Sequence, residues 1–445
     1  MKKFSVLLCA FVGLLFSACG GGEEGWKRVD GVIVFDTPER EPGQKSVLGL
    51  RTAPMETVRV GFIGLGMRGP GAVERFTHLD GVEIKALCDL YPERVESAQG
   101  ILSKRGFPEA ASYSGEEGWK QLCERDDIDL VYIATPWLKH VPMAVYAMEL
   151  GKHVAVEVPA AQSLEECWQL VNTAEKYQRH CMMLENCVYD FFELTTLNMA
   201  RHGLFGEILH VEGSYIHNLD EFWDYYQGNW RLDFDQKHRG DVYATHGLGP
   251  ACQLLGIHRG DKMNYLVAMD TKSVNGLKAA REKMGVDTFA NGDHTLTLIK
   301  TEKGRTIHLQ HNVYTPRPYS RMYQLTGTEG FANKYPVEGY AFRAGQLAGS
   351  GVPDHENLIV RDIEDKAREV GGHGGMDFIM DYRLIYCLRN GLPLDQDVYD
   401  AAEWSCIGAL TAMSLDHNSA PVAVPDFTRG DWNKIDGYRH ALSGE

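Results

Sequence analysis

The chain has 445 residues, of which 44% are hydrophobic, and it carries a formal net charge of −16. This length and composition predict a globular protein of two or three domains with a substantial core. The negative charge argues against nucleic acid as a partner, because binding phosphates requires a basic face, and it is compatible with a neutral substrate.

The N-terminus resembles the signal peptide of a bacterial lipoprotein. A short basic start at residues 1–3 precedes an apolar run from Phe4 to Phe16. That run is shorter than the roughly 20 residues that a membrane-spanning helix requires. Small residues then lead to Cys19, where cleavage and lipidation are expected. Residues 1–19 are therefore interpreted as a signal, and the protein as lipid-anchored in the cell envelope, on its periplasmic or cell-surface face, with no other membrane contact.

Residues 20–56 contain few apolar periodicities and several Glu, Gly and Pro, so we expect a tether and an irregular N-terminal arm. Two of the ten cysteines, Cys9 and Cys19, fall in the leader. The others show no Cys-x-x-Cys pair and lie within apolar patterns. They are expected to be buried free thiols rather than a disulfide framework or a zinc site.

A glycine-rich turn follows a predicted strand that begins at Val58. The turn contains Gly64 for a tight bend, Gly66 for close approach to a pyrophosphate, and Gly69 for packing of the next helix on the strand. Asp89 ends the next predicted strand, 82–88, where its carboxylate can accept hydrogen bonds from both ribose hydroxyls and repel a 2′-phosphate. The combination predicts NAD rather than NADP.

Strands and helices alternate through residue 188. After the strands already named, we expect strands at 129–135, 153–159 and 181–186, and helices at 71–79, 92–105, 119–125, 141–150 and 163–179. A capping box, Ser163-Leu-Glu-Glu166, begins the last of these helices. The alternation predicts right-handed crossovers and a doubly wound parallel sheet, so residues 57–188 are interpreted as a Rossmann domain of the α/β class.

Beyond residue 189 the pattern changes to period-two alternation, at 208–217, 295–300, 306–311 and 322–327. Helices are expected near 250–256, 376–390 and 398–413. Residues 189–445 are therefore expected to form a substrate-binding α+β domain with an open, mostly antiparallel sheet. Its segment from His373 to Asp377 lacks a third ligand at metal-site spacing, so it is interpreted as a loop and helix start that lines the cleft, and no metal is predicted.

Ligands of open parallel sheets bind beyond the carboxyl ends of the strands. Motifs at these ends resemble the glucose–fructose oxidoreductase / inositol dehydrogenase superfamily: Gly64–Gly69, Ala134–Pro136 and Glu157–Pro159, together with 377–383. Within it, the chain resembles glycoside hydrolase family 109 over about Thr57 to Trp432. This closer resemblance rests on Gly66–Gly69, Trp137-x-x-His140, Glu157-Val158-Pro159-Ala160, Tyr243-Ala-Thr-His246-Gly-Leu-Gly249-Pro250 and Arg317-Pro-Tyr319-Ser-Arg321.

The resemblance implies an NAD-dependent α-N-acetylgalactosaminidase. Such an enzyme oxidises the sugar at C3, eliminates the aglycone, adds water and reduces the ketone again, with retention at C1 and with a tightly bound NAD that is recycled in each turnover. NAD-dependent glycosidases are exceptions to the paired-carboxylate mechanism. Sugar dehydrogenases of the superfamily usually have a catalytic lysine where this chain has Val158, which makes a plain dehydrogenase less favoured.

Three residues are the catalytic candidates. His246 is suited to take the proton from O3, because an imidazole titrates near neutral pH. Tyr243, three residues earlier, can bind a sugar hydroxyl or assist proton loss at C2. Tyr319 is a second candidate for the C2 base, because its neighbours Arg317 and Arg321 are expected to lower the pKa of its phenol.

Further contacts follow from the resemblance. The substrate is expected to touch these three residues and also Tyr215, Glu157 and Tyr189. The cofactor contacts carried over are Gly64, Gly66, Met67, Arg68, Gly69, Asp89, Trp137, His140, Glu157, Val158, Asn186 and Arg231.

Two alternatives belong to other classes of function. An NAD-dependent sugar or cyclitol oxidoreductase of the same superfamily would need to reoxidise its cofactor, for which the envelope offers no obvious supply. A non-catalytic NAD- or sugar-binding lipoprotein would not require the titratable groups Tyr243, His246 and Tyr319. The natural glycan and aglycone, tolerance of β linkages, the membrane face, the identity of the C2 base and assembly into a homo-oligomer are left open.

Overall fold

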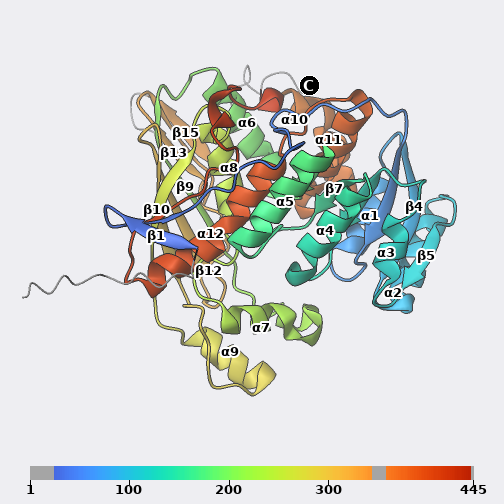
Figure 1. Cartoon of the computed structure of the whole chain (residues 1–445), viewed down its shortest axis with the longest axis horizontal. Helices are drawn as coiled ribbons and strands as arrows, with labels where there is room; N and C mark the ends of the chain where they lie inside the picture. The colour runs from blue at the N-terminus through green and yellow to red at the C-terminus, as the bar shows by residue number, and fades with distance from the viewer. Residues whose placement is uncertain (1–24, 343–356, 442–445) are drawn as a thin grey trace, which may run out of the picture.

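The computed structural model describes residues 25–342 and 357–441, which form two sheets with helices between and around them (Figure 1). The predicted signal and Cys19 lie outside the described residues. In the part of the chain that is described, no helix is long and apolar enough to cross a membrane. The described cysteines, from Cys88 to Cys406, are all buried and free, as predicted.

The first sheet has six parallel strands in the order β5-β4-β3-β6-β7-β8. In chain order this is 3-2-1-4-5-6, the doubly wound arrangement that was predicted, and its switch point lies between β3 and β6. The strands are β3 (Val58–Ile63), β4 (Val82–Asp89), β5 (Ala111–Ser114), β6 (Leu130–Ile133), β7 (His153–Val156) and β8 (Cys181–Met183).

Helices α1 to α5 connect or follow these strands, at Gly69–Phe76, Pro92–Lys104, Gly118–Cys123, His140–Glu149 and Leu164–Tyr177. The Ser163 hydroxyl caps α5 by accepting from the Glu166 N–H. The Glu166 carboxylate accepts from the N–H of Gln162 instead of that of Ser163, so the predicted capping box is displaced by one residue. Strand β8 is also shorter than predicted: it ends at Met183, and a 3-10 turn, η2 (Asn186–Tyr189), follows.

The second sheet has ten strands and is mostly antiparallel, as predicted. Its strands are β1 (Trp26–Val29), β2 (Val32–Phe35), β9 (Ile208–Ile216), β10 (Met263–Asp270), β11 (Thr295–Thr301), β12 (Thr306–Asn312), β13 (Gln324–Gly327), β14 (Gly330–Asn333), β15 (Gly339–Phe342) and β16 (Val422–Ala423). Two of its pairs, β9 with β12 and β2 with β16, are parallel.

The N-terminal arm differs from the prediction. It contains a hairpin, β1 (Trp26–Val29) and β2 (Val32–Phe35), which joins the second sheet through the pair Ile33 and Val422. Ile33 is fully buried there. Four-residue strands show almost no periodicity on their own, and their partner strand β16 lies almost 400 residues away in the chain.

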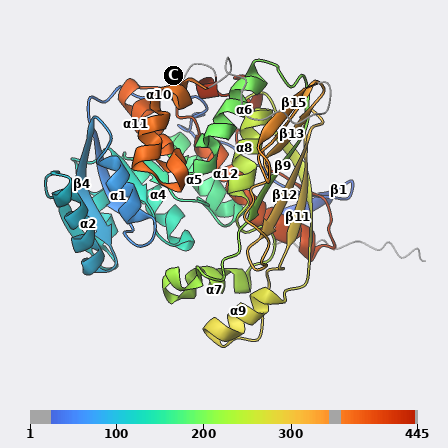
Figure 2. The ribbon, with the colours of Figure 1, turned by 180° about the vertical axis from the view of Figure 1, so that it is seen from behind.

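Helices α8 (Thr245–Leu255) and α12 (Val398–Asp416) lie between the two sheets together with α5 (Figure 1). Helix α11 (Met376–Asn390) packs on α1, and α10 (Leu358–Val370) links α11 to α6 (Phe191–Arg201) (Figure 2). Helices α7 (Trp230–Lys237) and α9 (Asn275–Met284) pack on each other and project below the sheets (Figure 1).

Candidate active site

A cleft of about 990 Å³ lies at the carboxyl ends of β3, β4, β6 and β7 and extends to residues of β9, α7 and α8. This is the switch point at which doubly wound sheets bind their ligands. Most of the predicted site residues line the cleft: Gly64, Gly66, Met67, Arg68, Asp89, Trp137, His140, Glu157, Val158, Asn186, Tyr215, Arg231, Tyr243, His246 and Tyr319.

The glycine turn has the shape that a dinucleotide requires. Gly64 has a φ of +93°, and a Cβ there would lie 2.5 Å from the carbonyl oxygen of Ala134. A Cβ on Gly69, which lies behind the turn, would lie 2.0 Å from the oxygen of Gly64. Gly69 begins α1, and no side chain caps that helix. Pro70 has no N–H and the Ala72 N–H bonds to the Arg68 carbonyl, so the N–H groups of Gly69 and Gly71 are the ones available to a pyrophosphate.

Asp89 is held at the end of β4, where a ribose would lie. Its carboxylate accepts from the N–H groups of Leu65 and Tyr91 at 2.7 and 3.0 Å. Arg94 of α2 lies 3.4 Å from the same carboxylate and beside Gly66. Arg94 also donates to Gln227, so it links the first sheet's helices to the loop that precedes α7.

Arg68 connects the glycine turn to the other walls of the cleft. Its guanidinium pairs with Glu157 after β7 and with Asp377 of α11, both at 3.1 Å. Asp377 also accepts from the side-chain amide of Asn186 at 2.5 Å and bonds to His373. Burial opposes its ionisation, but Arg68 and the other partners hold the pKa of Asp377 well below its usual range. His373 and Met376 do line the cleft, as predicted for this segment.

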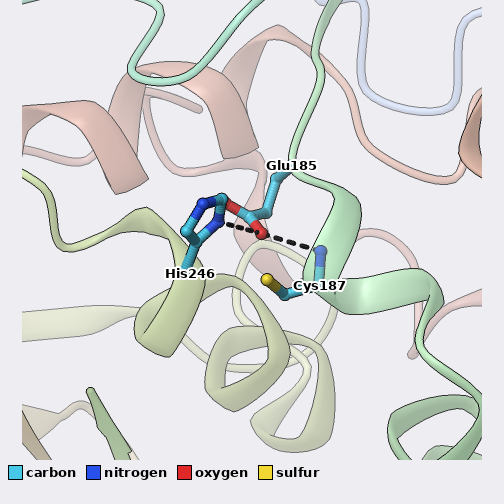
Figure 3. A group of neighbouring side chains, drawn as sticks. All are labelled: Glu185, Cys187 and His246. Carbon is cyan, nitrogen blue, oxygen red and sulfur yellow. Dashed lines mark hydrogen bonds and ion pairs between the residues drawn. The ribbon is translucent and has the colours of Figure 1, made fainter. Parts of the chain in front are cut away.

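His246 forms a dyad with Glu185, a residue that sequence reasoning missed. The Nδ1 atom of His246 lies 2.8 and 2.9 Å from the two carboxylate oxygens (Figure 3). Glu185 is fully buried, whereas 13% of the His246 side chain is exposed, toward the cleft. Burial favours the neutral acid, but His246 and the Cys187 N–H together hold the pKa of Glu185 below its ordinary value.

Glycines place the two halves of the dyad together. Helix α8 packs directly on β9: a Cβ on Gly213 would lie 2.2 Å from the oxygen of Gly247. A Cβ on Gly249 would lie 2.9 Å from the Cγ of Glu185. Only glycine allows such close approach of backbones and side chains. The His-Gly-Leu-Gly segment of the Tyr243 to Pro250 motif thus serves to seat His246 against Glu185.

The same corner is the one group of ligand-type side chains in the described chain that could hold a metal ion. Atoms of Glu185, Cys187 and His246 lie within 4.8 Å of one another (Figure 3). However, burial raises the pKa of the Cys187 thiol well above its usual value, and Nδ1 of His246 is already bonded to Glu185. We therefore interpret Glu185 and His246 as an acid–base dyad. The prediction that the protein binds no metal stays a prediction.

Aromatic rings and one cation surround the dyad. The rings of Tyr243 and Tyr215 lie 5.0 and 5.4 Å from that of His246. The Arg231 guanidinium carbon lies 4.5 Å from the Tyr243 ring centroid. Arg231 is 3% exposed, and among the described residues its Nε and one terminal nitrogen have no hydrogen-bond partner. Burying a cation whose N–H donors have no partner costs free energy, unless a ligand or an anionic group accepts hydrogen bonds from them.

Burial dominates the tyrosine pKa values. It raises the pKa of Tyr215 to about 12 and that of Tyr243 well above its usual value, while Arg231 acts in the opposite direction on both. The expectation that a cationic neighbourhood lowers the pKa of Tyr319 is wrong: desolvation raises it, and Arg321 offsets only part of the effect. Arg317 bonds to Gln310.

One other predicted residue differs from expectation. Tyr189 is fully buried and does not line the cleft. Its phenol faces Asp395 and Arg383, so the predicted substrate contact is wrong. His140 does line the cleft, although its side chain is fully buried, and its two nitrogens face the carbonyl oxygens of Pro159 and Thr135 at 2.8 Å. It holds the loops after β6 and β7 together at the wall of the cleft.

Comparison with known proteins identifies relatives of both parts of the chain. Residues 189–434 match the family model of the glycosyl hydrolase 109 C-terminal domain. Residues 58–185 match that of an oxidoreductase family with an NAD-binding Rossmann fold. The cofactor of the first part is therefore NAD, in agreement with the glycine turn and Asp89.

Curated relatives cover almost the whole chain. The chain is 61% identical to glycosyl hydrolase family 109 protein 1 of Bacteroides fragilis, over 99% of this chain and 100% of that protein. It is 59% identical to a glycosyl hydrolase family 109 protein of Porphyromonas gingivalis, over 99% of each.

Solved structures share the fold at low identity. Levoglucosan dehydrogenase in complex with NADH matches with a TM-score of 0.63 and 19% identity, over 83% of this chain and 100% of that one. Myo-inositol dehydrogenase from Lactobacillus casei, in complex with NAD(H) and myo-inositol, matches with a TM-score of 0.57 and 20% identity, over 84% and 99%.

Proposed function

The chain belongs to glycosyl hydrolase family 109, and on this basis we propose that it removes terminal α-linked N-acetylgalactosamine from glycans with a tightly bound NAD that is recycled in each turnover. One observation carries the proposal. The glycine turn and the Glu185–His246 dyad open into the same cleft. Val158 lines this cleft too, at the position where the resemblance implies a catalytic lysine in superfamily dehydrogenases, so we assign proton transfer at the sugar to His246.

The first chemical task is to remove the proton from O3. Bound NAD would accept a hydride from C3 of the sugar and later return it, so that no external oxidant is consumed. The Nε2 atom of His246 takes the O3 proton, since Nδ1 stays with Glu185. The buried carboxylate fixes the ring and stabilises the imidazolium. The same ring returns the proton to O3 in the last step.

The second task is to remove the proton from C2, which the C3 carbonyl makes acidic. Loss of this proton forms the C1–C2 double bond and expels the aglycone oxygen from C1 with its electron pair. Of the two predicted tyrosines we favour Tyr243, because it lies beside both His246 and Arg231. The unused N–H groups of Arg231 can stabilise a phenolate. Water then adds at C1, the proton that it releases balances the one that the departing aglycone oxygen takes up, and the base returns a proton to C2.

The test uses the purified protein and p-nitrophenyl α-N-acetylgalactosaminide, without added NAD, in heavy water. We expect release of nitrophenol, no accumulation of NADH, and one solvent deuterium at C2 of the released sugar. Direct displacement at C1 would leave the C2 hydrogen in place and would contradict the elimination. Accumulation of NADH without nitrophenol would instead indicate an oxidoreductase.

Replacement of the base separates catalysis from binding. His246→Ala should abolish turnover while the bound NAD remains in the protein. The control is His308→Ala, which removes a histidine on β12 outside the cleft and should leave the rate unchanged. If His246→Ala instead loses its NAD, His246 supports the cofactor and the assigned role is wrong.

A further inference from the structure

The outer part of the cleft carries aromatic side chains that the proposed chemistry does not require. A series of rings leads outward from Tyr215. The hydroxyl of Tyr215 lies 3.1 Å from Nδ1 of His217. The ring centroid of His217 lies 5.2 Å from those of both Phe222 and Tyr319. Phe222 in turn lies 6.0 Å from Tyr225. We refer to His217, Phe222, Tyr225 and Tyr319 as the aromatic rim.

Exposure rises steeply along this series. Tyr215 is 7% exposed, Phe222 40%, Tyr319 45% and Tyr225 66%. A single exposed aromatic ring is ordinary, but adjacent exposed rings at the mouth of a cleft are typical of a binding surface. All four rim residues line the same cleft as the dyad.

The buried end of the cleft is closed on the side of the dyad. Glu185, Arg231 and Tyr243 are all under 9% exposed there. If O3 of the target sugar faces His246, the rest of the glycan, attached through C1, can leave only toward the open side. The aromatic rim adjoins the dyad through Tyr215, whose ring centroid lies 5.4 Å from that of His246 and 5.7 Å from that of His217.

We propose that the aromatic rim binds the sugar to which the target N-acetylgalactosamine is attached. The inference rests on the proposed function and adds the preference for an aglycone. A pyranose ring presents a face of C–H groups, which packs on aromatic rings, while their polar ends can bond to its hydroxyls. The charged neighbours of the rim in the chain, Glu221, Asp224 and Arg317, do not line the cleft. Burial, with Arg231, His246 and His373, lowers the pKa of His217 to about 4, so the rim is uncharged at neutral pH and suits a neutral sugar.

The experiment compares three substrates with matched target sugars. Methyl α-N-acetylgalactosaminide has a minimal aglycone, N-acetylgalactosaminyl-α-1,3-galactose has a neutral sugar, and α-N-acetylgalactosaminyl serine has an amino acid. Phe222→Ala and Tyr225→Ala remove rim rings, and Phe222→Tyr keeps one. Tyr265→Ala is the control, because Tyr265 is similarly exposed, at 38%, but lies on β10 outside the cleft.

We expect the native protein to favour the disaccharide over the methyl glycoside in kcat/KM. Each alanine variant should reduce this preference roughly three- to tenfold, the size of one aromatic contact. The loss should fall mainly on KM, because the contact is similar in the ground and transition states. Phe222→Tyr and Tyr265→Ala should retain the preference. Retained NAD and an unchanged melting temperature identify the variants that fold. Tyr225 is exposed, so Tyr225→Ala should not disturb the core.

The outcomes separate the two proposals. If the native protein cleaves the disaccharide and the methyl glycoside equally well, or if both alanine variants keep the preference, the rim is not a sugar subsite, although the glycosidase stands. A rim-dependent preference for the serine substrate would overturn the sugar assignment in favour of a peptide aglycone. If none of the three is cleaved, the proposed function fails and this inference fails with it.

Discussion

Glu185 is the residue whose removal tests the dyad most directly. Glu185→Gln keeps the shape but leaves the imidazolium of His246 without its carboxylate partner. We expect kcat to fall about 10- to 100-fold, as for other residues that orient a functional histidine. The pH profile should change as well, because the variant removes the carboxylate whose pKa the contact with His246 holds below its ordinary value. Steady-state rates from pH 4 to 9 measure both effects.

A matched control for Glu185 exists on the second sheet. Glu212 of β9 lies 3.4 Å from His308, outside the cleft. Glu212→Gln should leave the rate and the pH profile unchanged, whereas Glu185→Asp should restore part of the lost activity. A Glu185→Gln protein with native kcat and an unshifted profile would show that the carboxylate has only a structural role.

At this scale, sequence reasoning succeeded where the geometry is local. Gly64, Gly69 and Asp89 lie within one strand–turn–helix–strand unit, so their roles are visible in the spacing. Glu185 and His246 are 61 positions apart, and the packing of α8 on the η2 turn brings them together. The prediction that Tyr189 contacts the substrate was wrong for a related reason. It lies close to Asn186 in the chain, yet the turn η2 directs its side chain away from the cleft.

The loop before α7 and helix α2 form a contact over the cofactor side of the cleft. Arg94 of α2 donates to Gln227 of the loop and lies beside both Asp89 and Gly66. This bridge joins the two parts of the chain across the cleft. The proposed recycling of NAD requires that the cofactor is retained between turnovers, and we propose that the bridge slows its release.

Arg94→Ala should therefore release NAD faster. We expect the variant to lose its NAD during dialysis while the native protein keeps it, and added NAD should restore it. The measurement is the NAD content of the denatured protein before and after dialysis, which does not depend on activity. Lys104→Ala, at the end of the same helix, serves as the control. If the native and Arg94→Ala proteins retain NAD equally well, the bridge does not slow the release of NAD.

Element boundaries show the same division between local and distant effects. Helix α11 was predicted at its observed bounds, because its caps and apolar spacing are local signals. The hairpin β1–β2 was missed, because its stability comes from β16, near the other end of the chain. The parallel pairing of β9 with β12 was also invisible, since alternation predicts a half-buried strand but not the direction of its neighbour.

For the whole molecule, the cellular location remains a proposal that rests on the leader. Cys19 should carry the lipid if residues 1–19 act as a lipoprotein signal. Cys19→Ser should move the protein from the membrane fraction to the soluble fraction of the cell envelope, without loss of specific activity. Fractionation and immunoblotting measure the change. If both forms fractionate with the cytoplasm, the signal interpretation is wrong.

The core between the two sheets contains a buried ion pair that links stability to pH. His258, just after α8, pairs with Glu403 of α12, and Arg259 pairs beside it with Asp397 and Asp400. Burial opposes the charged imidazolium. The carboxylates outweigh this effect and raise the pKa of His258 to about 9.

Because this pKa is raised in the folded state, the stabilisation is fully present below the unfolded value of about 6.5 and is lost as pH rises through about 9. At about 1.4 kcal/mol per pKa unit, the loss amounts to roughly 3 kcal/mol. Melting temperatures should therefore fall between pH 6.5 and 9, and His258→Gln should abolish much of that slope while lowering stability at pH 6. His180→Gln is the contrasting variant, since burial lowers the pKa of His180 to about 3, so that it is neutral throughout this range. A native melting temperature that stays constant from pH 6.5 to 9 would show that His258 is uncharged in the core.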